Sequence, residues 1–392
     1  MVTEDVRTDI RNHEIRNEPE EWQLKSFNEL FSLEYGTGNP EKNRGGSKYP
    51  VFGSNGIIGF VEEYLVQGPG IIVGRKGSIG KVTWSNVNFW PIDTTYYLKL
   101  KSKTDLKWLF YELSNLKLEK LNTATGVPGL NRNDVYNISS LIPNFNEQQK
   151  IAKILSDTDT LIESLDKLIT KKKNIKQGLM QTLLARGIGH TKFKTTEIGE
   201  IPKELATKKF YEILKTVKGT LPHTLLDYDE SEKLQPYLSA EYLRGHYEKA
   251  KYCFIEDEKR ITTVDKDDII VIWDGSNAGE FLLGMKGVLS STMAKVVFKE
   301  GRISREFIYY FLKRCEGILK NTTKGSTIPH VDGNTLSNLD ILLPTLQEQQ
   351  KIAKILSDAD SEIVALEQKK DKYKILKTGM MQQFLTGGIR VK

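Results

Sequence analysis

The stretch EQQKIAKILSD occupies residues 147–157, and the same eleven letters recur at residues 348–358. An offset of 201 residues also holds outside the match, as three further pairs show: Pro143 and Pro344, Asp159 and Asp360, Gly187 and Gly388. The segments that precede the two copies differ from one another. The chain of 392 residues is therefore a tandem repeat, in which each half is a variable module followed by a nearly invariant one.

The invariant segments have the periodicity of long α-helices. Apolar residues recur every three or four positions, which places them on one face of a helix. In the first copy they are Ile151, Ile154, Leu155, Leu161, Ile162, Leu165, Leu168, Ile169, Ile175, Leu179 and Leu183. Each segment opens with the spacing of a capping box, Asn144 to Glu147 and Thr345 to Glu348. Each closes with glycines that suit a helix C-terminus: Gly187, Gly189, Gly387 and Gly388.

A helix of about forty residues is roughly 60 Å long, at 1.5 Å per residue. A compact module cannot cover an apolar stripe of that length, so we expect the two helices to form an antiparallel coiled coil that holds the modules apart. Gly178 and Gly379 lie inside the helices, where glycine costs about 1 kcal/mol. Their recurrence favours close approach of another helix, from this chain or a partner; the alternative is an accidental kink. Lys171–Lys173 is either a phosphate contact or, more simply, a solvated face.

The variable modules have mixed strand and helix signals in the same order. Short β-rich runs broken by glycine precede a helix in each module. The expected fold class is α+β, with two globular mixed α/β modules separated by the two helices. The expected boundaries are an N-terminal arm at 1–18, module one at 19–145, helix one at 146–189, module two at 190–346 and helix two at 347–392.

One pair of loops carries the most functional information. Module one has GRKGSIGK at residues 74–81, and module two has WDGSNAG at residues 273–279. Arg75 and Lys76 can donate to guanine edges or phosphate, whereas Asp274 and Asn277 suit cytosine or adenine edges. Two modules that recognise different DNA sequences require loops with the same backbone and different side chains. An ordinary exposed turn is the alternative.

A second pair of loops, at 123–130 and 322–329, is rich in small and hydroxylated residues that could contact phosphates, or could be plain connections. Together the loops and nearby basic residues supply the candidate DNA contacts, which are Arg44, Arg75, Lys76, Ser78, Lys81, Thr125, Arg132, Arg244, Asp274, Ser276, Asn277, Lys324, Ser326 and Thr327.

Composition excludes several classes of protein. The net charge of +6 is only a mild bias toward a polyanionic partner. No run approaches the ~20 apolar residues of a membrane span, and the polar, acidic N-terminus does not predict a signal peptide. Cys253 and Cys315 lack the spacing of a zinc site, and two cysteines make a disulfide framework improbable, as expected for the cytoplasm.

We also find no sequence signature of catalysis. The Asn/Asp-Pro-Pro-aromatic tetrad of adenine methyltransferases does not occur, and residues 74–81 lack the GxxxxGK[ST] spacing of a phosphate loop. The five histidines are scattered, with neither metal nor triad spacing. We expect no catalytic residue, metal or cofactor.

The repeat resembles the specificity subunit of type I restriction-modification enzymes. Leu141–Asp159 and Leu342–Asp360 look like the conserved helical regions of that family, and GIIVGRKGSIG at 70–80 resembles its target-recognition domains. The Pro19-x-x-Trp22 segment that opens module one is similar to the family's pattern. In module two, Pro202 is followed by Leu205 in place of the tryptophan.

The resemblance implies a non-catalytic DNA-recognition subunit. It would bring two methyltransferase subunits, joined by restriction and translocase subunits, to an asymmetric bipartite double-stranded site for adenine methylation or restriction. Methylation requires base flipping, so the subunit should also help to hold deformed DNA. The residues expected to contact the partner or the coiled coil are Glu147, Gln148, Lys150, Gly178, Glu348, Gln349, Lys351 and Gly379.

The competing interpretation is a coiled-coil scaffold or transcriptional regulator that uses tandem modules to bind DNA and has no methyltransferase partner. A neighbouring methyltransferase gene would favour the first interpretation.

Overall fold

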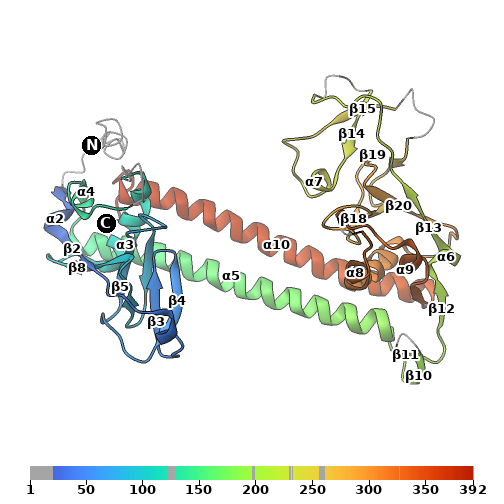
Figure 1. Cartoon of the computed structure of the whole chain (residues 1–392), viewed down its shortest axis with the longest axis horizontal. Coiled ribbons are helices and arrows are strands. Elements are labelled where there is room, and N and C mark those ends of the chain that lie inside the picture. Colours follow the sequence, from blue (N-terminus) through green and yellow to red (C-terminus); the bar gives the residue numbers. More distant parts are fainter. Residues whose placement is uncertain are drawn as a thin grey trace. The chain divides into compact units, whose positions relative to one another are not determined.

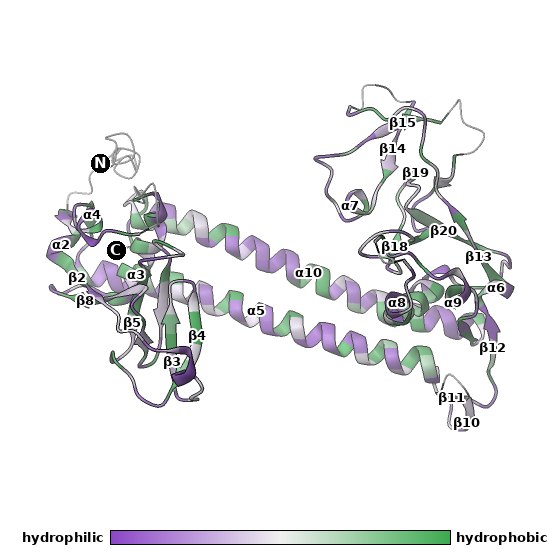
Figure 2. Cartoon of the chain, in the orientation of Figure 1, coloured by the Kyte–Doolittle hydropathy of each residue, from purple (hydrophilic) through white to green (hydrophobic). Residues whose placement is uncertain are grey.

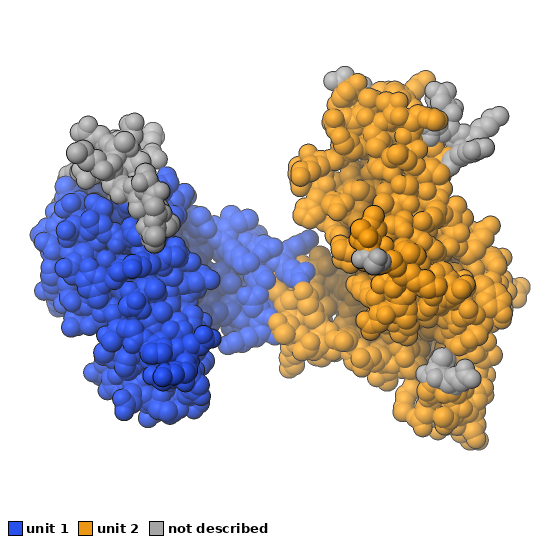
Figure 3. All heavy atoms as spheres, viewed as in Figure 1, with its two compact units in different colours: residues 1–167, 367–392 blue, residues 168–366 orange. Residues whose placement is uncertain are grey.

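A computed structural model of the chain describes residues 21–121, 129–196, 199–228, 231, 233–255, 261–325 and 327–391. The expected N-terminal arm, Thr125 and Ser326 lie outside these residues. The chain forms two compact units, coloured separately in Figure 3: unit 1 comprises Met1–Lys167 and Glu367–Lys392, and unit 2 comprises Leu168–Leu366. Each unit thus contains one variable module and part of both long helices. The functional boundaries inferred from the repeat cut the chain differently and stay a prediction.

Module one, in unit 1, consists of short strands and helices (Figure 1). They are β1 (Gln23–Ser26), α2 (Phe27–Leu30), β2 (Phe31–Tyr35), the 3-10 helix η1 (Glu41–Asn43), β3 (Tyr49–Gly53), β4 (Gly56–Val61), β5 (Gly70–Gly74), β6 (Val82–Ser85), β7 (Trp90–Pro91), β8 (Thr95–Leu100), α3 (Leu106–Asn115), η2 (Leu118–Leu121), α4 (Arg132–Tyr136) and β9 (Ser139–Ile142). The strands form sheets of order β2-β8-β5-β6, β4-β3-β7 and β1-β9.

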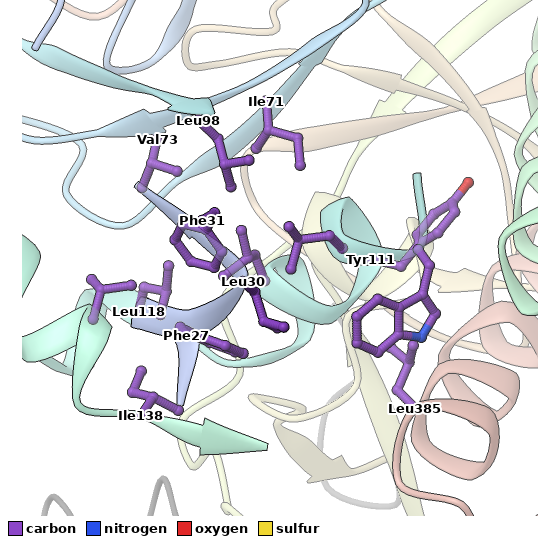
Figure 4. Packing of buried hydrophobic residues seen from close by; sticks show 14 of the residues in the cluster. Phe27, Leu30, Phe31, Ile71, Val73, Leu98, Tyr111, Leu118, Ile138 and Leu385 are labelled. Atoms are coloured by element: carbon purple, nitrogen blue, oxygen red, sulfur yellow. The ribbon is translucent and has the colours of Figure 1, made fainter. Parts of the chain in front are cut away.

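The core of unit 1 joins module one to both long helices. Figure 4 shows Phe27, Leu30 and Phe31 packed beside Val73 and Leu98 of the four-stranded sheet. The same buried cluster contains Ile151 and Leu155 from the helix that follows the module, and Leu385 from the end of the second long helix. Burial of these apolar side chains in one cluster removes them from water, which stabilises the contact between the module and the helices.

Module two, in unit 2, repeats this plan. Its elements are β10 (Phe193–Thr196), β11 (Gly199–Pro202), β12 (Ala206–Lys209), α6 (Phe210–Ile213), β13 (Leu214–Lys218), β14 (Leu234–Leu238), α7 (Ala240–Leu243), β15 (Tyr252–Phe254), β16 (Thr263–Val264), β17 (Ile269–Ile272), β18 (Phe281–Leu283), β19 (Gly287–Leu289), β20 (Met293–Phe298), α8 (Arg305–Asn321), α9 (Gly333–Ser337) and β21 (Asp340–Leu343). Its sheets have the orders β13-β20-β17-β18, β15-β14-β19-β16, β12-β21 and β10-β11.

The sheet β2-β8-β5-β6 of module one matches the sheet β13-β20-β17-β18 of module two strand for strand. In each, a strand that follows a one-turn helix pairs with the strand that precedes the module's main helix: β2 with β8, and β13 with β20. The main difference lies between β14 and β15, where module two carries α7 and module one has a tight turn between β3 and β4. The expected α+β fold class is therefore confirmed.

The invariant segments are the long helices α5 (Phe145–Arg186, 42 residues) and α10 (Leu346–Leu385, 40 residues). Figure 2 shows apolar residues recurring along both helices among polar ones. In unit 1 the end of α10 packs against the start of α5, and in unit 2 Leu184, near the end of α5, packs against Ile352 and Leu356 at the start of α10. The antiparallel arrangement expected from the stripe is confirmed in each unit.

The glycines inside the helices do not pack closely against another helix of this chain, and close approach of a partner's helix stays a prediction. A Cβ atom added to Gly178 or Gly379 would meet no atom within 4 Å, so close packing of a helix of this chain at these positions is wrong. The glycines at the helix ends do have their expected role. Gly187 and Gly387 have φ of 64° and 77°, in the left-handed region that closes a helix without a steric penalty.

Across the described parts of the chain, we find no helix with the length and apolar character needed to cross a membrane.

Candidate nucleic-acid interface and helix joints

The loop after β5 in module one is held by backbone hydrogen bonds. The amides of Arg75 and Lys76 both donate to the carbonyl of Thr94, at 2.9 and 3.1 Å. The amide of Gly80 returns to the carbonyl of Gly74 at 2.8 Å, and the amide of Leu130 donates to the carbonyl of Arg75 at 2.8 Å. The loop conformation is therefore set by main-chain atoms, which leaves the side chains free to differ.

Module two holds its loop with the same bonds. The amides of Trp273 and Asp274 both donate to the carbonyl of Thr292, at 2.8 and 3.0 Å. The amide of Gly279 returns to the carbonyl of Ile272 at 2.9 Å. Arg75 is thus equivalent to Trp273, and Lys76 to Asp274. The two loops therefore share these anchoring bonds and present different side chains, and the loop of module two is one residue longer.

A basic and aromatic cluster surrounds the loop of module one. The guanidinium of Arg75 lies 4.9 Å from the ring of Tyr35 and 5.9 Å from that of Tyr96, and the guanidinium of Arg132 lies 5.2 Å from the ring of Tyr35. Burial, with Tyr35 adding to it, raises the pKa of Tyr96 to about 12. Tyr96 is therefore a neutral phenol, which donates to the carbonyl of Leu130 at 3.0 Å.

Other candidates in module one are placed differently. The side chains of Lys76 and Lys81 are exposed and Ser78 is half-buried. The ammonium of Lys81 is bonded to the Asn55 carbonyl at 2.8 Å, so it also braces the turn between β3 and β4. Arg44 donates from Nε to the carbonyl of Asn39 at 2.9 Å and from Nη2 to the same atom. The Arg44 guanidinium thus also stabilises a turn, and its contact with DNA stays a prediction.

In module two the equivalent surface contains paired charges. Lys218 at the end of β13 bonds the Asp274 carboxylate at 3.1 Å, and its ammonium lies 5.4 Å from the ring of Trp273. Lys218 therefore engages one oxygen of Asp274, and the carboxylate keeps lone pairs that could accept from a base edge. Lys324 pairs with Asp332 at 3.0 Å.

The remaining candidate DNA contacts of module two include three exposed residues and one arginine that forms an ion pair. Ser276, Asn277 and Thr327 are exposed. Arg244 pairs with Glu280 at 2.6 Å, which ties α7 to the loop before β18. The Arg244 guanidinium is thus engaged within the module, and its contact with DNA stays a prediction.

Sequence reasoning missed Tyr35, Lys218 and Trp273. They lie at strand ends, where no motif spacing identifies them. The usable signal is a second offset of 183 residues: Phe27, Leu30 and Phe31 align with Phe210, Ile213 and Leu214, which places Tyr35 opposite Lys218.

The invariant glutamates form joints within the chain. The Glu147 carboxylate accepts bonds from Arg390 Nε and Nη2, both at 2.8 Å, from Trp22 Nε1 at 3.1 Å and from the amide of Val391 at 3.2 Å. Burial alone would raise the pKa of Glu147, but the bonds from Arg390 and Trp22 outweigh it and hold the pKa below its ordinary value. The carboxylate therefore fastens the last residues of the chain to the start of module one.

Unit 2 has the corresponding joint. The Glu348 carboxylate accepts the amide of Ile188 at 2.7 Å and lies 3.1 Å from His190 Nε2. The other ring nitrogen of His190 lies 3.1 Å from Glu204. The residues just beyond α5 thus contact Glu348 as the residues beyond α10 contact Glu147.

The neighbouring glutamines are equally internal. Gln148 accepts the amide of Asp105 at 2.7 Å, and Gln349 accepts the amide of Ser304 at 2.9 Å. Their amide groups donate to the carbonyls of the prolines that precede each helix, at 2.8 and 2.9 Å. Glu147, Gln148 and Gln349 are buried. These buried side chains hold each module against the start of the helix that follows it. The residues left for a proposed docking surface are therefore exposed ones such as Lys150 and Lys351.

Within the described residues, no group of three or more His, Cys, Asp or Glu side chains is arranged to hold a metal ion. Both cysteines are buried free thiols.

The family model of the type I restriction modification DNA specificity domain matches residues 19–176 and 202–375. The chain belongs to this family. The prediction made from the repeat is confirmed. The two matched segments each contain one variable module and most of the helix that follows it.

Curated relatives in the family are named as specificity subunits. The MjaVIII specificity subunit of Methanocaldococcus jannaschii is 40% identical over 197 residues, which cover 50% of this chain and 45% of that relative. The chain therefore spans about half the length of that relative. The putative MjaX specificity subunit of the same organism is 24% identical and covers 98% of this chain and 97% of its own.

The fold is also shared with a solved structure. The crystal structure of a type I restriction-modification system S subunit from M. genitalium superposes with a TM-score of 0.65, covering 94% of this chain and 97% of that one, at 18% identity.

Proposed function

We propose that this chain is the DNA specificity subunit of a type I restriction-modification enzyme. Each module reads one half of an asymmetric bipartite duplex site. The paired helices set the unread spacer and dock two methyltransferase subunits, which methylate adenine, and restriction and translocase subunits join them for cleavage. The chain itself contributes recognition and assembly rather than catalysis, and it works on DNA in the cytoplasm.

One observation carries the proposal: two modules hold an equivalent loop with the same main-chain bonds and fill it with different side chains. A conserved loop backbone fixes where a side chain meets a base edge, and the side chain decides which base is accepted. Arg75 and Lys76 in one module and Trp273 and Asp274 in the other present different donors and acceptors. Two different half-sites follow.

The invariant helices support a duplicated protein partner. Their eleven identical residues include side chains that the fold buries, but also Gln149, Lys150, Lys153 and Asp157, which are exposed, as are their copies at 350, 351, 354 and 358. Exposed positions usually diverge freely between repeats because substitutions there change stability little. Their identity supports two copies of one docking surface, related by approximate twofold symmetry.

The length of the helices supports an unread spacer. At 1.5 Å per residue, each helix extends for about 60 Å. One turn of DNA is about 34 Å, so half-sites set apart by such helices leave unread base pairs between them.

Methylome sequencing of the host with and without this gene tests the proposal. We expect the deletion to abolish methyladenine at one bipartite motif and complementation to restore it. An unchanged methylome in the deletion strain would refute the assignment.

A further inference from the structure

The ends of two equivalent strands carry side chains that no motif had indicated. Tyr35 is the last residue of β2 and pairs with Tyr96 in β8. Lys218 is the last residue of β13 and pairs with Ala294 in β20. Since Val73 faces Tyr96 and Val271 faces Ala294 in the adjoining strands, the two sheets have the same register. Tyr35 and Lys218 therefore occupy one position in two copies of the fold.

At this position each module forms a cation–aromatic contact between the strand and the loop, but the strand and the loop exchange which of them supplies the cation and which the ring. In module one the strand supplies the aromatic ring of Tyr35 and the loop supplies the cation of Arg75, 4.9 Å apart. In module two the strand supplies the cation of Lys218 and the loop supplies the ring of Trp273, 5.4 Å apart.

Fold stability does not account for these pairs. Tyr35 is 50% exposed and the side chain of Lys218 is also 50% exposed. An exposed cation–aromatic contact contributes little to the stability of a fold. Aromatic rings beside basic groups are, in contrast, effective partners for nucleic acids, since rings contact bases and cations contact base edges or phosphates.

The surroundings of the two pairs differ in charge. In module one, Arg75 and Arg132 flank the same ring, and no ion pair among the described residues engages either guanidinium. In module two, Lys218 is shared between the ring of Trp273 and the carboxylate of Asp274. The first surface offers donors alone, and the second offers a donor beside an acceptor.

We propose that Tyr35 and Lys218 are specificity-determining residues, and that the exchanged cation–aromatic pairs make the two half-sites different. Module one, where Arg75 and Arg132 form no ion pair within the described residues, selects a half-site with guanine at the contacted position. Module two selects a base pair that offers both a donor and an acceptor to Asp274 and Lys218. This inference rests on the proposed function.

The test is methylome sequencing of host strains that carry Tyr35→Ala or Lys218→Met at the native gene. We expect each variant to relax the preference at one or two base pairs of one half-site by about tenfold, the discrimination of a single good base contact, and to leave the other half unchanged. Tyr35→Ala and Lys218→Met should affect opposite halves. Tyr35→Phe, which keeps the ring, should retain the wild-type motif.

Two matched controls remove an equally exposed side chain away from the loops. Tyr211→Ala deletes a tyrosine that is 51% exposed on α6, and Lys215→Met deletes an exposed lysine on the same strand as Lys218. Both should keep the wild-type motif at both halves.

The outcomes separate the two proposals. A wild-type strain without any bipartite motif refutes the proposed function. A wild-type motif that both variants reproduce, or a loss that affects both half-sites equally, refutes only the role of Tyr35 and Lys218. If Tyr35→Ala does not accumulate in the cell, a double variant replaces it. Tyr35→Lys with Arg75→Trp rebuilds the pair of module two in module one. We expect this double variant to change the half-site that module one reads, and an unchanged half-site would refute the role of Tyr35.

Discussion

Glu112 on α3 is fully buried in unit 1, where its carboxyl accepts the Ser140 hydroxyl at 2.5 Å. Burial raises the pKa of Glu112 to about 7, and the bond from Ser140 offsets only part of that rise. The equivalent positions of module two carry Phe311 and Ile341, so one module keeps a polar pair where the other has an apolar one. The carboxyl is therefore neutral over much of the range in which an exposed glutamate is charged.

Glu112→Gln should stabilise unit 1 in a pH-dependent way. Below pH 4.5 the carboxyl is neutral in the folded and the unfolded chain, so the substitution changes little. Between pH 4.5 and about 7 only the unfolded chain ionises, which favours unfolding of the wild type. The free energy of unfolding of the variant should exceed that of the wild type by up to about 3 kcal/mol at pH 8. Urea unfolding at pH 4.5 and at pH 8 measures this difference. The exposed Glu119→Gln is the control, and equal effects at both pH values would contradict the assignment.

His190 makes the joint of unit 2 sensitive to pH. Burial lowers its pKa, but the bonds to Glu204 and Glu348 outweigh this and raise the pKa above the ordinary 6.5. The stabilisation is complete below pH 6.5 and disappears as the pH rises through the folded-state value. His190→Gln should therefore lower the melting temperature of unit 2 more at pH 6 than at pH 8.5.

The joint of unit 1 provides the comparison. Arg390 stays protonated throughout, because its bonds to Glu147 raise a pKa that is already high. Arg390→Gln should lower the melting temperature of unit 1 by the same amount at pH 6 and pH 8.5. A pH-independent effect of His190→Gln would show that its carboxylate contacts are not charge-assisted.

Between elements, one tyrosine links each module to both long helices. Tyr111 of α3 donates to Asp159 of α5 at 2.8 Å, and the same carboxylate pairs with Lys377 of α10 at 2.6 Å. In unit 2, Tyr310 of α8 donates to Asp360 at 2.9 Å, and Lys176 pairs with that carboxylate. Each group thus joins three elements that are distant in sequence, which orients the module on the helices.

Removing either tyrosine hydroxyl should weaken this junction. Tyr111→Phe and Tyr310→Phe should each lower the free energy of unfolding by about 1.5–3 kcal/mol, the usual contribution of a hydrogen bond to a charged group. Chemical denaturation measures the loss, and the exposed Tyr211→Phe should show none. Wild-type stability in both variants would mean that the lysines alone hold the carboxylates.

At the scale of the whole molecule, the chain places the same joint in both of its units. Glu147 and Glu348 occupy equivalent positions, as do Asp159 and Asp360 and the lysines that bind them. Equivalent joints in the two units support the proposed assembly with two copies of one partner. The helices between the joints then act as a ruler under the proposed function.

Deleting seven residues from the middle of both helices, 164–170 and 366–372, should shorten the unread spacer. Seven residues account for about 10.5 Å of helix and keep the apolar face in phase, so the spacer should lose about three base pairs. Methylome sequencing reads the motif directly. Deletion from one helix alone is the control and should abolish methylation, because the facing ion pairs lose their register. An unchanged spacer in the double deletion would refute the ruler.

The repeat, the two long helices, the α+β modules and the family were all predictable from the sequence. Each depends on local periodicity or on identity between the copies, both of which survive without knowledge of distant contacts. The roles of Glu147 and Gln148 were not predictable, because an invariant polar residue has the same appearance in sequence whether it faces a partner or closes an internal joint. Only the folded chain brings Arg390 to Glu147 and Lys218 to Asp274. The partners of each pair are far apart in sequence, and tertiary packing places them side by side. It is packing, too, that places Tyr35 beside Arg75 and exchanges their chemistry in module two.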